Sequence, residues 1–541
     1  MFTIQIFLAL FIFILMVLIS VEDLATGFLF LLILMPLQHK ELFSLAYWDV
    51  LPIRVAFFGI LLSTSYRFYL WFRRSKNIDY IKGFLKDPVL ILLLVLYIIR
   101  FISILFVAQE KFEGFKLLAF YTTVVYFYIL LKFLYLKKGI SLIKKYTFVY
   151  VLLASLMGLV AVIQFYVFKV FDFKFGAIWE IPGHNPRLGS TFWDVNHFGA
   201  FVASAIPLSI AWLVSSKKIN RRLFWLFNTL FLSYALYLTQ SRSSWMGIAI
   251  ALFFFFLFLF LKGFKKYATY LAVFSALGLF SILFYLQVFS GGILPTYKKF
   301  MHTRLDSFKS HFVLLRGAFE VYEKKPLLGA GYGNFNNAFR KTSYSDTYFF
   351  REKNIVDKKV PSHSIWGEVV AETGFLGLFF YSLLFSFILL FLLKGFFGKK
   401  SIKDSLFQLG FFASILSMLV SGIFYTYNLE FFWFAIFLGA IFAFENNKGF
   451  NLNSLYKFLV NNRYLVPLTL VLISSLLIFW DLNRNTFIDW DEAIYAKVAK
   501  NIVVSKNWLT LQWSIGTPWF EKPPLYMWFS AFFMFFLGIN E

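Results

Sequence analysis

The sequence contains no cysteine, and charged residues make up only 15% of its 541 residues. Without cysteine, neither structural disulfides nor thiolate metal sites are available. Soluble domains are about a quarter charged and about 45–50% apolar, whereas this chain is 60% hydrophobic, with a mean hydropathy of +0.72. Because a soluble fold needs polar residues on its surface, these values exclude a water-soluble enzyme, a disordered chain and a collagen-like fibre.

Acidic residues are also scarce: 28 Asp and Glu against 52 Lys and Arg give a net charge of +24. In a soluble protein this excess would suggest nucleic acid binding. Here, however, every second connection between apolar segments is basic, at residues 73–86, 132–145, 217–222, 262–266 and 394–403. This positive-inside pattern predicts that those loops are cytoplasmic and the intervening ones extracytoplasmic. We therefore expect the charge to set membrane orientation and to meet membrane lipids, with no nucleic acid partner.

The hydrophobic residues form runs that are long enough to cross a bilayer. About 17–25 apolar residues cover about 30 Å of hydrocarbon, so the runs predict an all-α, polytopic integral membrane protein with about 14–15 transmembrane helices. The first run lacks a basic start and a cleavage site and is predicted to be a retained helix; the second is short enough to be re-entrant. The expected spans are residues 2–20, 24–38, 51–71, 88–107, 115–136, 146–168, 198–214, 223–239, 244–261, 267–289, 365–393, 406–424, 428–444, 464–480 and 525–538.

One predicted extracytoplasmic loop, at about residues 290–364, is far longer than the others, and loops of this size are usually functional. Apolar residues repeat within it at helical spacing and predict an amphipathic helix from about 304 to 324. Lys324 and Pro326 supply a cationic last turn and a helix breaker. We expect this helix to lie across the mouth of the membrane bundle. Its predicted apolar face consists of Leu305, Phe308, Phe312, Leu315 and Phe319.

Polar residues gather in four places on the predicted extracytoplasmic side, at residues 182–198, 239–245, 326–335 and 363–377. In the second of these, Arg242 lies in a turn of a few residues between two apolar spans. An arginine this close to hydrocarbon is costly and commonly marks a functional site. Its planar guanidinium suits bidentate binding of a phosphate or diphosphate. The simpler alternative is an arginine that snorkels to the interface.

His363 lies where the long loop enters a span, so that its ring can reach a polar cavity above the bundle. The ordinary pKa of histidine suits general-base work on a sugar hydroxyl, and an interfacial, hydrogen-bonded histidine is the alternative. Glu368 and Glu372 follow it, four residues apart on one helix face. Ionised carboxylates at this depth need partners, for which Arg242 and Arg316 are candidates; a solvated helix start is the alternative.

The remaining polar residues of this side give weaker signals. Residues 329–333 have the glycine spacing of a phosphate-cradling loop, but no strand precedes them, so we predict a turn. His184 and His197 have no Asp or His partner at metal-ligand spacing, so we predict no metal site there. Further cations are candidates for binding either an anionic ligand or lipid headgroups: Arg187, Arg304, Arg316 and Arg340.

Taken together, these motifs resemble those of the O-antigen ligase and O-antigen polymerase superfamily, in that family's usual order. His363 and Ser364, followed after nine residues by Gly374 and Gly377, match the pattern H-[NSQ]-x9-G-x-x-G. The Ser-Arg turn at 241–242, the stretch 187–198 and the turn 326–335 look like the family's other blocks, and the long loop before the histidine is similar too. The resemblance covers about residues 1–445.

The resemblance implies a metal-independent, inverting membrane glycosyltransferase without a cofactor, in O-antigen or cell-surface polysaccharide biosynthesis. A glycan on undecaprenyl diphosphate would move to lipid A core, a growing polysaccharide or a protein, on the extracytoplasmic face of the inner (cytoplasmic) membrane. His363 would take the acceptor proton, and Arg242 would stabilise the leaving diphosphate. The implied helpers are Arg187, Arg316 and Arg304 for the diphosphate, and Glu368, Glu372, Gly374 and Gly377 as support.

Residues 464–541 follow a basic linker at 446–463 and are similar to the start of the dolichyl-phosphate-mannose mannosyltransferase and aminoarabinose-transferase group. The likeness rests on an acidic pair, Asp491-Glu492, and on a Lys-Pro-Pro-Leu block that starts at Lys522. It implies an acidic catalytic or metal-linked role for the pair, a phosphate-side or anchoring role for Lys522, and a divalent metal in a complete module. Because that family continues for many more spans, we expect this module to be incomplete; helix capping is the alternative for the acidic pair.

Two competing interpretations remain. Some members of the superfamily have been described as solute or bicarbonate transporters, and the C-terminal module is an alternative seat of polyprenyl-phosphate-sugar transfer. A carrier is expected to have paired, interrupted helices and midplane charges. Here the polar groups gather at one face, and only Arg100 lies deep in a span. This distribution favours an enzyme.

Overall fold

The structure is a computed structural model that describes residues 2–37, 42–45, 48–75, 87–180, 186–264, 269, 293–351, 359–398, 402–427, 429–446 and 491–537. The chain divides into two compact units, Met1–Asn451 and Leu452–Glu541. This division falls inside the predicted linker 446–463, but that linker and the predicted span 464–480 lie largely or wholly outside the described residues. The domain boundaries therefore stay predictions.

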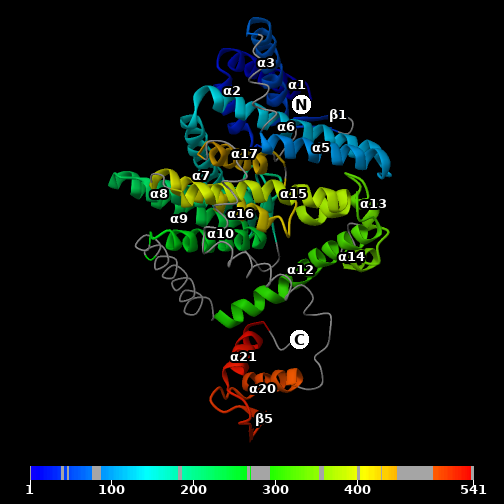
Figure 1. The fold of residues 1–541 in the computed structure, drawn as a ribbon, viewed down its shortest axis with the longest axis vertical. Helices are drawn as coiled ribbons and strands as arrows, with labels where there is room; N and C mark the ends of the chain where they lie inside the picture. The colour runs from blue at the N-terminus through cyan, green and yellow to red at the C-terminus, as the bar shows by residue number, and fades with distance from the viewer. Residues whose placement is uncertain are drawn as a thin grey trace. The chain divides into compact units, whose positions relative to one another are not determined.

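The described part of the first unit is helical, with two short antiparallel ribbons (Figure 1). In one ribbon β1 (Phe43–Leu45) pairs with β2 (Trp48–Val50), and in the other β3 (Ile178–Trp179) pairs with β4 (Arg187–Leu188). The all-α class is confirmed. The described helices are α1 (Phe2–Glu22), α2 (Leu24–Leu34), α3 (Pro52–Ser75), α5 (Pro88–Phe106), α6 (Lys111–Lys138), α7 (Ile140–Phe171), α8 (Val195–Ser215), α9 (Ile219–Thr239), α10 (Arg242–Leu261), α12 (Ile293–Lys324), α13 (Phe335–Phe339), α14 (Ser345–Arg351), α15 (Ile365–Phe397), α16 (Ile402–Ser421) and α17 (Leu429–Asn446).

Each predicted span that the structure describes coincides with a helix. Among the helices that the structure describes, seven have the length and hydropathy to cross a membrane: α1, α5, α6, α7, α8, α10 and α15. The predicted span 24–38 appears as α2, which has only 11 residues and begins where Asp23 accepts hydrogen bonds from the amides of Ala25 and Thr26. It is too short to cross about 30 Å as a helix. The predicted span 267–289 lies almost entirely outside the described residues.

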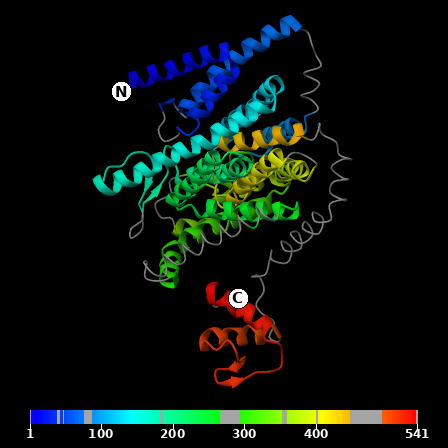
Figure 2. The ribbon, with the colours of Figure 1, turned by 90° about the vertical axis from the view of Figure 1, so that its left-hand side faces the viewer.

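Helix α8 is largely buried and packs against α9, α10 and α16, and α15 packs against α16 (Figure 1). Small residues allow these helices to approach closely, as is common in membrane proteins. A Cβ atom on Gly247 of α10 would lie 2.4 Å from the carbonyl oxygen of Ser417 on α16. Likewise, a Cβ atom on Gly199 of α8 would lie 2.9 Å from the Cβ of Ser241. Helices α1 and α3 pack side by side, at the blue end of the chain in Figure 2.

Helix α12 contains the predicted amphipathic helix, but its buried face is not the predicted one. Leu314, Ala318 and Val321 are buried, whereas Phe312 is 41% exposed and Leu315 and Phe319 are half-buried. The reason is the small Gly317, where a Cβ atom would lie 2.3 Å from the ring of Phe339 on α13. The face with the smallest residues therefore packs against the protein, and the bulky aromatic residues lie outside it.

The second unit has its own small core. Its described elements are α20 (Asp491–Ser505), β5 (Gln512–Ser514), β6 (Thr517–Pro518) and α21 (Leu525–Leu537). The predicted acidic pair begins α20, but the side chains of Asp491 and Glu492 lie outside the described residues, and Lys522 is exposed. None of the three predicted roles is therefore tested. The core residues are Val498, Ala499, Ile502, Leu511, Trp519, Met527 and Ala531.

Candidate active site

His363 lies in a group of rings that come from four separate parts of the chain. Its imidazole centroid is 4.7 Å from that of His311 on α12 and 5.2 Å from the ring of Tyr425, in the loop between α16 and α17. The ring of Tyr425 lies 5.5 Å from that of His197, in the first turn of α8. We call these four residues, His197, His311, His363 and Tyr425, the histidine cluster. The fold assembles it from residues that are distant in sequence.

The backbone at His363 is held in an uncommon conformation. Its φ angle is 46°, in the left-handed region that non-glycine residues seldom occupy. On the amino-terminal side, the hydroxyl of Ser362 contacts Oε2 of Glu368 and the hydroxyl of Thr426, each at 2.7 Å. On the other side, Ser364 caps α15, and the amide of Ile365 donates to the carbonyl of Gly422 at 2.8 Å. These bonds fix the position from which the His363 side chain projects.

Two predicted cations lie next to this cluster. Arg187, on β4, donates from Nε to the carbonyl of Thr239 at 3.1 Å and from Nη2 to Oδ1 of Asn196 at 2.8 Å. It therefore joins the β3–β4 ribbon, the start of α8 and the end of α9. Arg242 is the first residue of α10, after a turn in which Gln240 has a φ of 49°. Both arginines act electrostatically on His311, so the structure brings these two predicted residues near the same imidazole.

A buried aspartate supports the other side of the cluster. Asp194 caps α8 by accepting from the amides of Asn196 and His197, and its Oδ1 lies 3.4 Å from Nδ1 of His197. Burial raises the pKa of Asp194, but hydrogen bonds from His197, Tyr425 and Asn196 more than offset this and lower it below its ordinary value. Asp194 is therefore an anion at neutral pH. The sequence signal for it, an Asp just before an apolar span, is the same as that of any helix cap.

The two facing histidines are both neutral at pH 7. Burial lowers the pKa of His363 to about 4, although the negative charge of Asp194 opposes the shift. Burial also lowers the pKa of His311 to about 3, and His363, Arg242 and Arg187 act in the same direction. A neutral imidazole can accept a proton, so His363 has the protonation state that a general base needs. Sequence reasoning missed His311, which appears there as a lone histidine on an amphipathic helix.

The glycines of the H-[NSQ]-x9-G-x-x-G pattern shape α15. Gly374 interrupts the helix with a φ of 63°, and a Cβ atom there would lie 2.6 Å from the backbone of Pro326 and Leu327. The freed amide of Phe375 donates to the carbonyl of Pro326 at 2.7 Å. The turn 326–335 therefore docks against the kink, and its positive-φ glycines at 329, 331 and 333 confirm a turn. This kink is the physical reason for glycine at position 374.

The expected partners of the two glutamates were wrong. Neither Arg242 nor Arg316 pairs with them in the described structure; instead Glu368 contacts Ser362, and Glu372 accepts from the amide of Phe335 at 3.0 Å. Arg100 on α5 is the cation within electrostatic reach of both carboxyl groups. The fold brings α5 against α15, a pairing that the sequence does not reveal.

Arg100 is itself held by aromatic rings. It is only 6% exposed, and its guanidinium lies 3.8 Å from the ring centroid of Tyr121 and 4.8 Å from that of Tyr332. Cation–π contacts of this kind stabilise a desolvated arginine. Arg100 thereby links the turn 326–335 to α5 and α6, and the arginine that the sequence places deep in a span is accounted for by these contacts.

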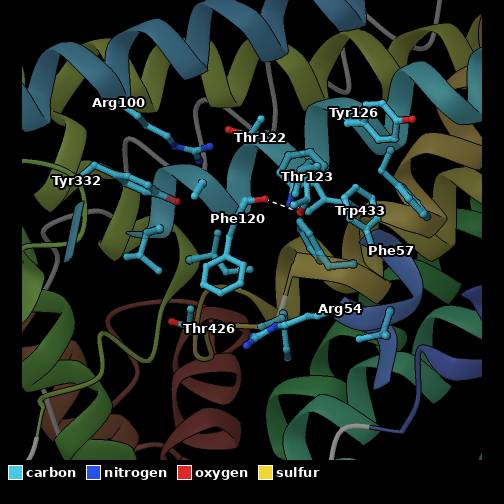
Figure 3. A pocket seen from close by; sticks show the side chains of 18 of the residues that line it. Arg54, Phe57, Arg100, Phe120, Thr122, Thr123, Tyr126, Tyr332, Thr426 and Trp433 are labelled. Atoms are coloured by element: carbon cyan, nitrogen blue, oxygen red, sulfur yellow. Dashed lines mark hydrogen bonds between the residues drawn. The ribbon is translucent and has the colours of Figure 1, made fainter. Parts of the chain in front are cut away.

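A cavity of about 650 Å³ lies beside the histidine cluster, between α2, α3, α5, α6, α15 and the start of α17. Its wall is mainly aliphatic and aromatic, and its volume is in the range of ligand pockets. Figure 3 shows Arg100 and Tyr332 on one side and Phe57, Tyr126 and Trp433 on the other. Thr426 and Tyr427 line the cavity, and the Tyr427 ring is 5.8 Å from that of His197. The cavity and the cluster therefore share a wall.

The described contacts do not connect the remaining predicted cations with the histidine cluster. Arg316 is exposed on α12, and none of its contacts within the described structure connects it to His363 or Arg242. Arg304 lies on the same helix, but its side chain is outside the described residues, as is His184. Arg340 lies near the ring of Phe349 on α14, 4.8 Å from its centroid. The diphosphate roles of Arg316 and Arg304 therefore remain predictions without support from the described contacts.

Comparison with known families identifies one segment of the chain. Residues 227–382 match the family model described as O-antigen ligase. The match covers Arg242, His311 and His363 but less than a third of the chain, and it leaves out Arg187 and most of the cavity wall. The match supports the predicted relationship of this segment to the O-antigen ligase superfamily, within a multi-pass membrane protein. No curated protein sequence matches the chain, and the likeness of residues 464–541 to mannosyltransferases stays a prediction.

Proposed function

We propose that the chain is a membrane glycosyltransferase that moves a glycan from a lipid diphosphate, of the undecaprenyl type, to an acceptor hydroxyl. The observation that carries the proposal is the neutral, half-buried His363 in ring contact with His311, on which Arg187 and Arg242 act electrostatically. A base and fixed cations at one place are what this transfer requires. The motif order and the family match at residues 227–382 support it independently.

In the proposed step, the acceptor oxygen attacks the anomeric carbon of the sugar and a new carbon–oxygen bond forms. The bond from that carbon to the diphosphate breaks, and its electron pair leaves with the diphosphate. The acceptor proton passes to His363, which the fold holds neutral. General-base assistance of this kind typically contributes about 10²–10⁴-fold to the rate. One direct displacement inverts the anomeric configuration.

Arg187 and Arg242 bind the diphosphate and stabilise the charge that grows on it. Both are held on rigid elements, Arg187 by two hydrogen bonds and Arg242 at the start of α10. Preorganised cations in a site that excludes water stabilise a leaving anion more strongly than solvent does. The two arginines therefore act on the leaving group, while His363 acts on the nucleophile.

The cavity holds the hydrocarbon chain of the lipid donor. Its wall is largely apolar and adjoins the histidine cluster at Thr426 and Tyr427, as a donor with a long chain and a diphosphate head requires. Each buried methylene group contributes about 0.8 kcal/mol to the binding of a lipid chain. The positive-inside pattern supports an extracytoplasmic position of the histidine cluster, in the cytoplasmic membrane. Lipid A core, a growing polysaccharide and a protein all present suitable acceptor hydroxyls.

Glycan display in cells tests the proposal. His363→Ala and Arg242→Ala should each abolish the surface glycan at normal protein level, whereas Lys325→Ala, at an exposed site, should not. Loss of long chains with single units still attached would identify a polymerase, and accumulation of unattached polymer would identify a ligase. Normal glycan in both site variants would refute the assignment and favour the transporter alternative.

A further inference from the structure

His311 is a half-buried member of the cluster for which the proposed mechanism has no use. Its ring lies 4.7 Å from that of His363, at an interplanar angle of 60°. Its Nδ1 atom is buried and has no hydrogen-bond partner among the described residues. Buried polar atoms usually have partners, and one without a partner beside a candidate active site suggests that a ligand supplies it.

The charges around His311 are mostly positive. Arg187 and Arg242 face it from β4 and α10, and His363 faces it from the segment before α15. On its own helix, among the residues whose side chains the structure describes, the nearby charged residues are Lys309 and Arg316. Tyr425 contacts His363, and Asp194, the anion on this side, acts on His363. A ligand placed among these groups meets an excess of positive charge.

We propose that His311 binds the diphosphate of the lipid donor as an imidazolium and takes up one proton from solvent when the donor binds. The inference rests on the proposed function and adds a third cation to the diphosphate site. A diphosphate brings at least two negative charges between His311 and the arginines, which reverses the local potential. Protonation then turns the unpartnered nitrogen into a donor toward a phosphate oxygen.

The neighbouring histidines are less suited to this role. His197 already lies 3.4 Å from the carboxylate of Asp194. His363 must remain neutral to accept the acceptor proton, and a positive His311 at 4.7 Å helps to keep it so until the sugar bond breaks. The two facing imidazoles thus have different roles: His311 binds the diphosphate, and His363 is the general base.

Calorimetry on the full chain in nanodiscs tests the inference, with farnesyl diphosphate as the probe. Titrations at one pH, in buffers of different ionisation enthalpy, give the number of protons taken up per ligand bound. We expect the number for the wild type to exceed that for His311→Gln by about one near neutral pH. His197→Gln and His363→Gln should retain the wild-type number. The ionisation of the probe itself is common to all variants and cancels in the comparison.

His311→Arg separates charge from structure, because arginine is permanently protonated. It should bind the probe but lack the extra proton uptake. Equal uptake by the wild type and His311→Gln would overturn the role of His311 while leaving the proposed function intact. No binding of farnesyl diphosphate by the wild type would overturn both. His311→Arg with wild-type uptake would also contradict the inference, since the proton would then bind elsewhere.

Discussion

Oε1 of Glu372 accepts a hydrogen bond from the backbone amide of Phe335, at 3.0 Å, and this bond ties the kinked helix α15 to the turn 326–335. The same kink gives that turn its docking place, through the amides of Phe375 and Leu376. Glu372 and Gly374 thus both stabilise the contact between the kink of α15 and the turn 326–335. Four consequences of the geometry can be tested separately from catalysis.

Gly374→Ala should destabilise the protein by about 1–3 kcal/mol, because alanine is strained at positive φ and its Cβ would meet the backbone of Pro326 and Leu327. Thermal unfolding in detergent measures the loss. Gly398→Ala is the control, since Gly398 has a φ of −62° and its nearest atoms lie at 3.3 Å or more. Equal melting temperatures for the two variants would contradict this account of the kink.

Arg187→Ala should weaken binding of farnesyl diphosphate by about 1.5–3 kcal/mol, or roughly tenfold or more, because a charge-assisted hydrogen bond is lost. Arg187→Lys should recover only part of the affinity, since a single ammonium cannot bridge Thr239 and Asn196 as the guanidinium does. Calorimetric dissociation constants measure both effects. Wild-type affinity in Arg187→Ala would remove this residue from the diphosphate site.

Stability should fall as the pH drops from about 6.5 toward 4, because the unfolded chain then binds protons that the fold excludes. The folded-state pKa values of His363 and His311 are lowered to about 4 and about 3, and a lowered histidine pKa removes stability below the unfolded value. Melting temperatures measured across this range should therefore decline. The decline should be smaller for a His311→Gln, His363→Gln double variant. An unchanged slope would show that both groups are accessible to protons.

Val369→Trp should partly fill the cavity and weaken binding of long-chain donors while sparing farnesyl diphosphate. Displacing two methylene groups costs about 1.6 kcal/mol, or more than tenfold in affinity. Leu94→Trp is the matched control, at a position that is 40% exposed. Comparing the dissociation constants for prenyl diphosphates of increasing length measures the effect. A loss of affinity that is equal for all prenyl chain lengths would show that the hydrocarbon chain of the donor binds outside this cavity.

The sequence predicted those parts of the site that have a local signature. His363, Gly374 and Gly377 lie within a single motif, and the Arg242 turn is conspicuous because it interrupts apolar spans. The ribbon that holds Arg187 and the electrostatic influence of Arg100 on the glutamates of α15 depend on tertiary packing, which the sequence pattern does not encode. For the same reason the described contacts of Glu368 and Glu372 are with Ser362 and Phe335, and not with the expected candidates Arg242 and Arg316. His311 and Asp194 resemble an ordinary helix residue and an ordinary cap until the fold brings them beside His363 and His197.

The buried face of α12 shows the same limit. Helical periodicity predicted a helix ending at Lys324 before Pro326, and the structure confirms that end. The largest apolar residues were expected to be buried, but Gly317 and Ala318 allow the closest approach of α13 and its neighbours. Periodicity identifies an amphipathic helix, whereas the packing partner decides which of its faces is buried.

The central claim is that His363 is the general base of a glycosyl transfer, and single-turnover transfer by the purified protein tests it most directly. With a lipid diphosphate glycan donor and a hydroxyl acceptor, the wild type should form product of inverted configuration. His363→Gln should be at least about 100-fold slower and should bind the donor within about threefold of the wild type. A His363→Gln rate equal to that of the wild type would contradict the account.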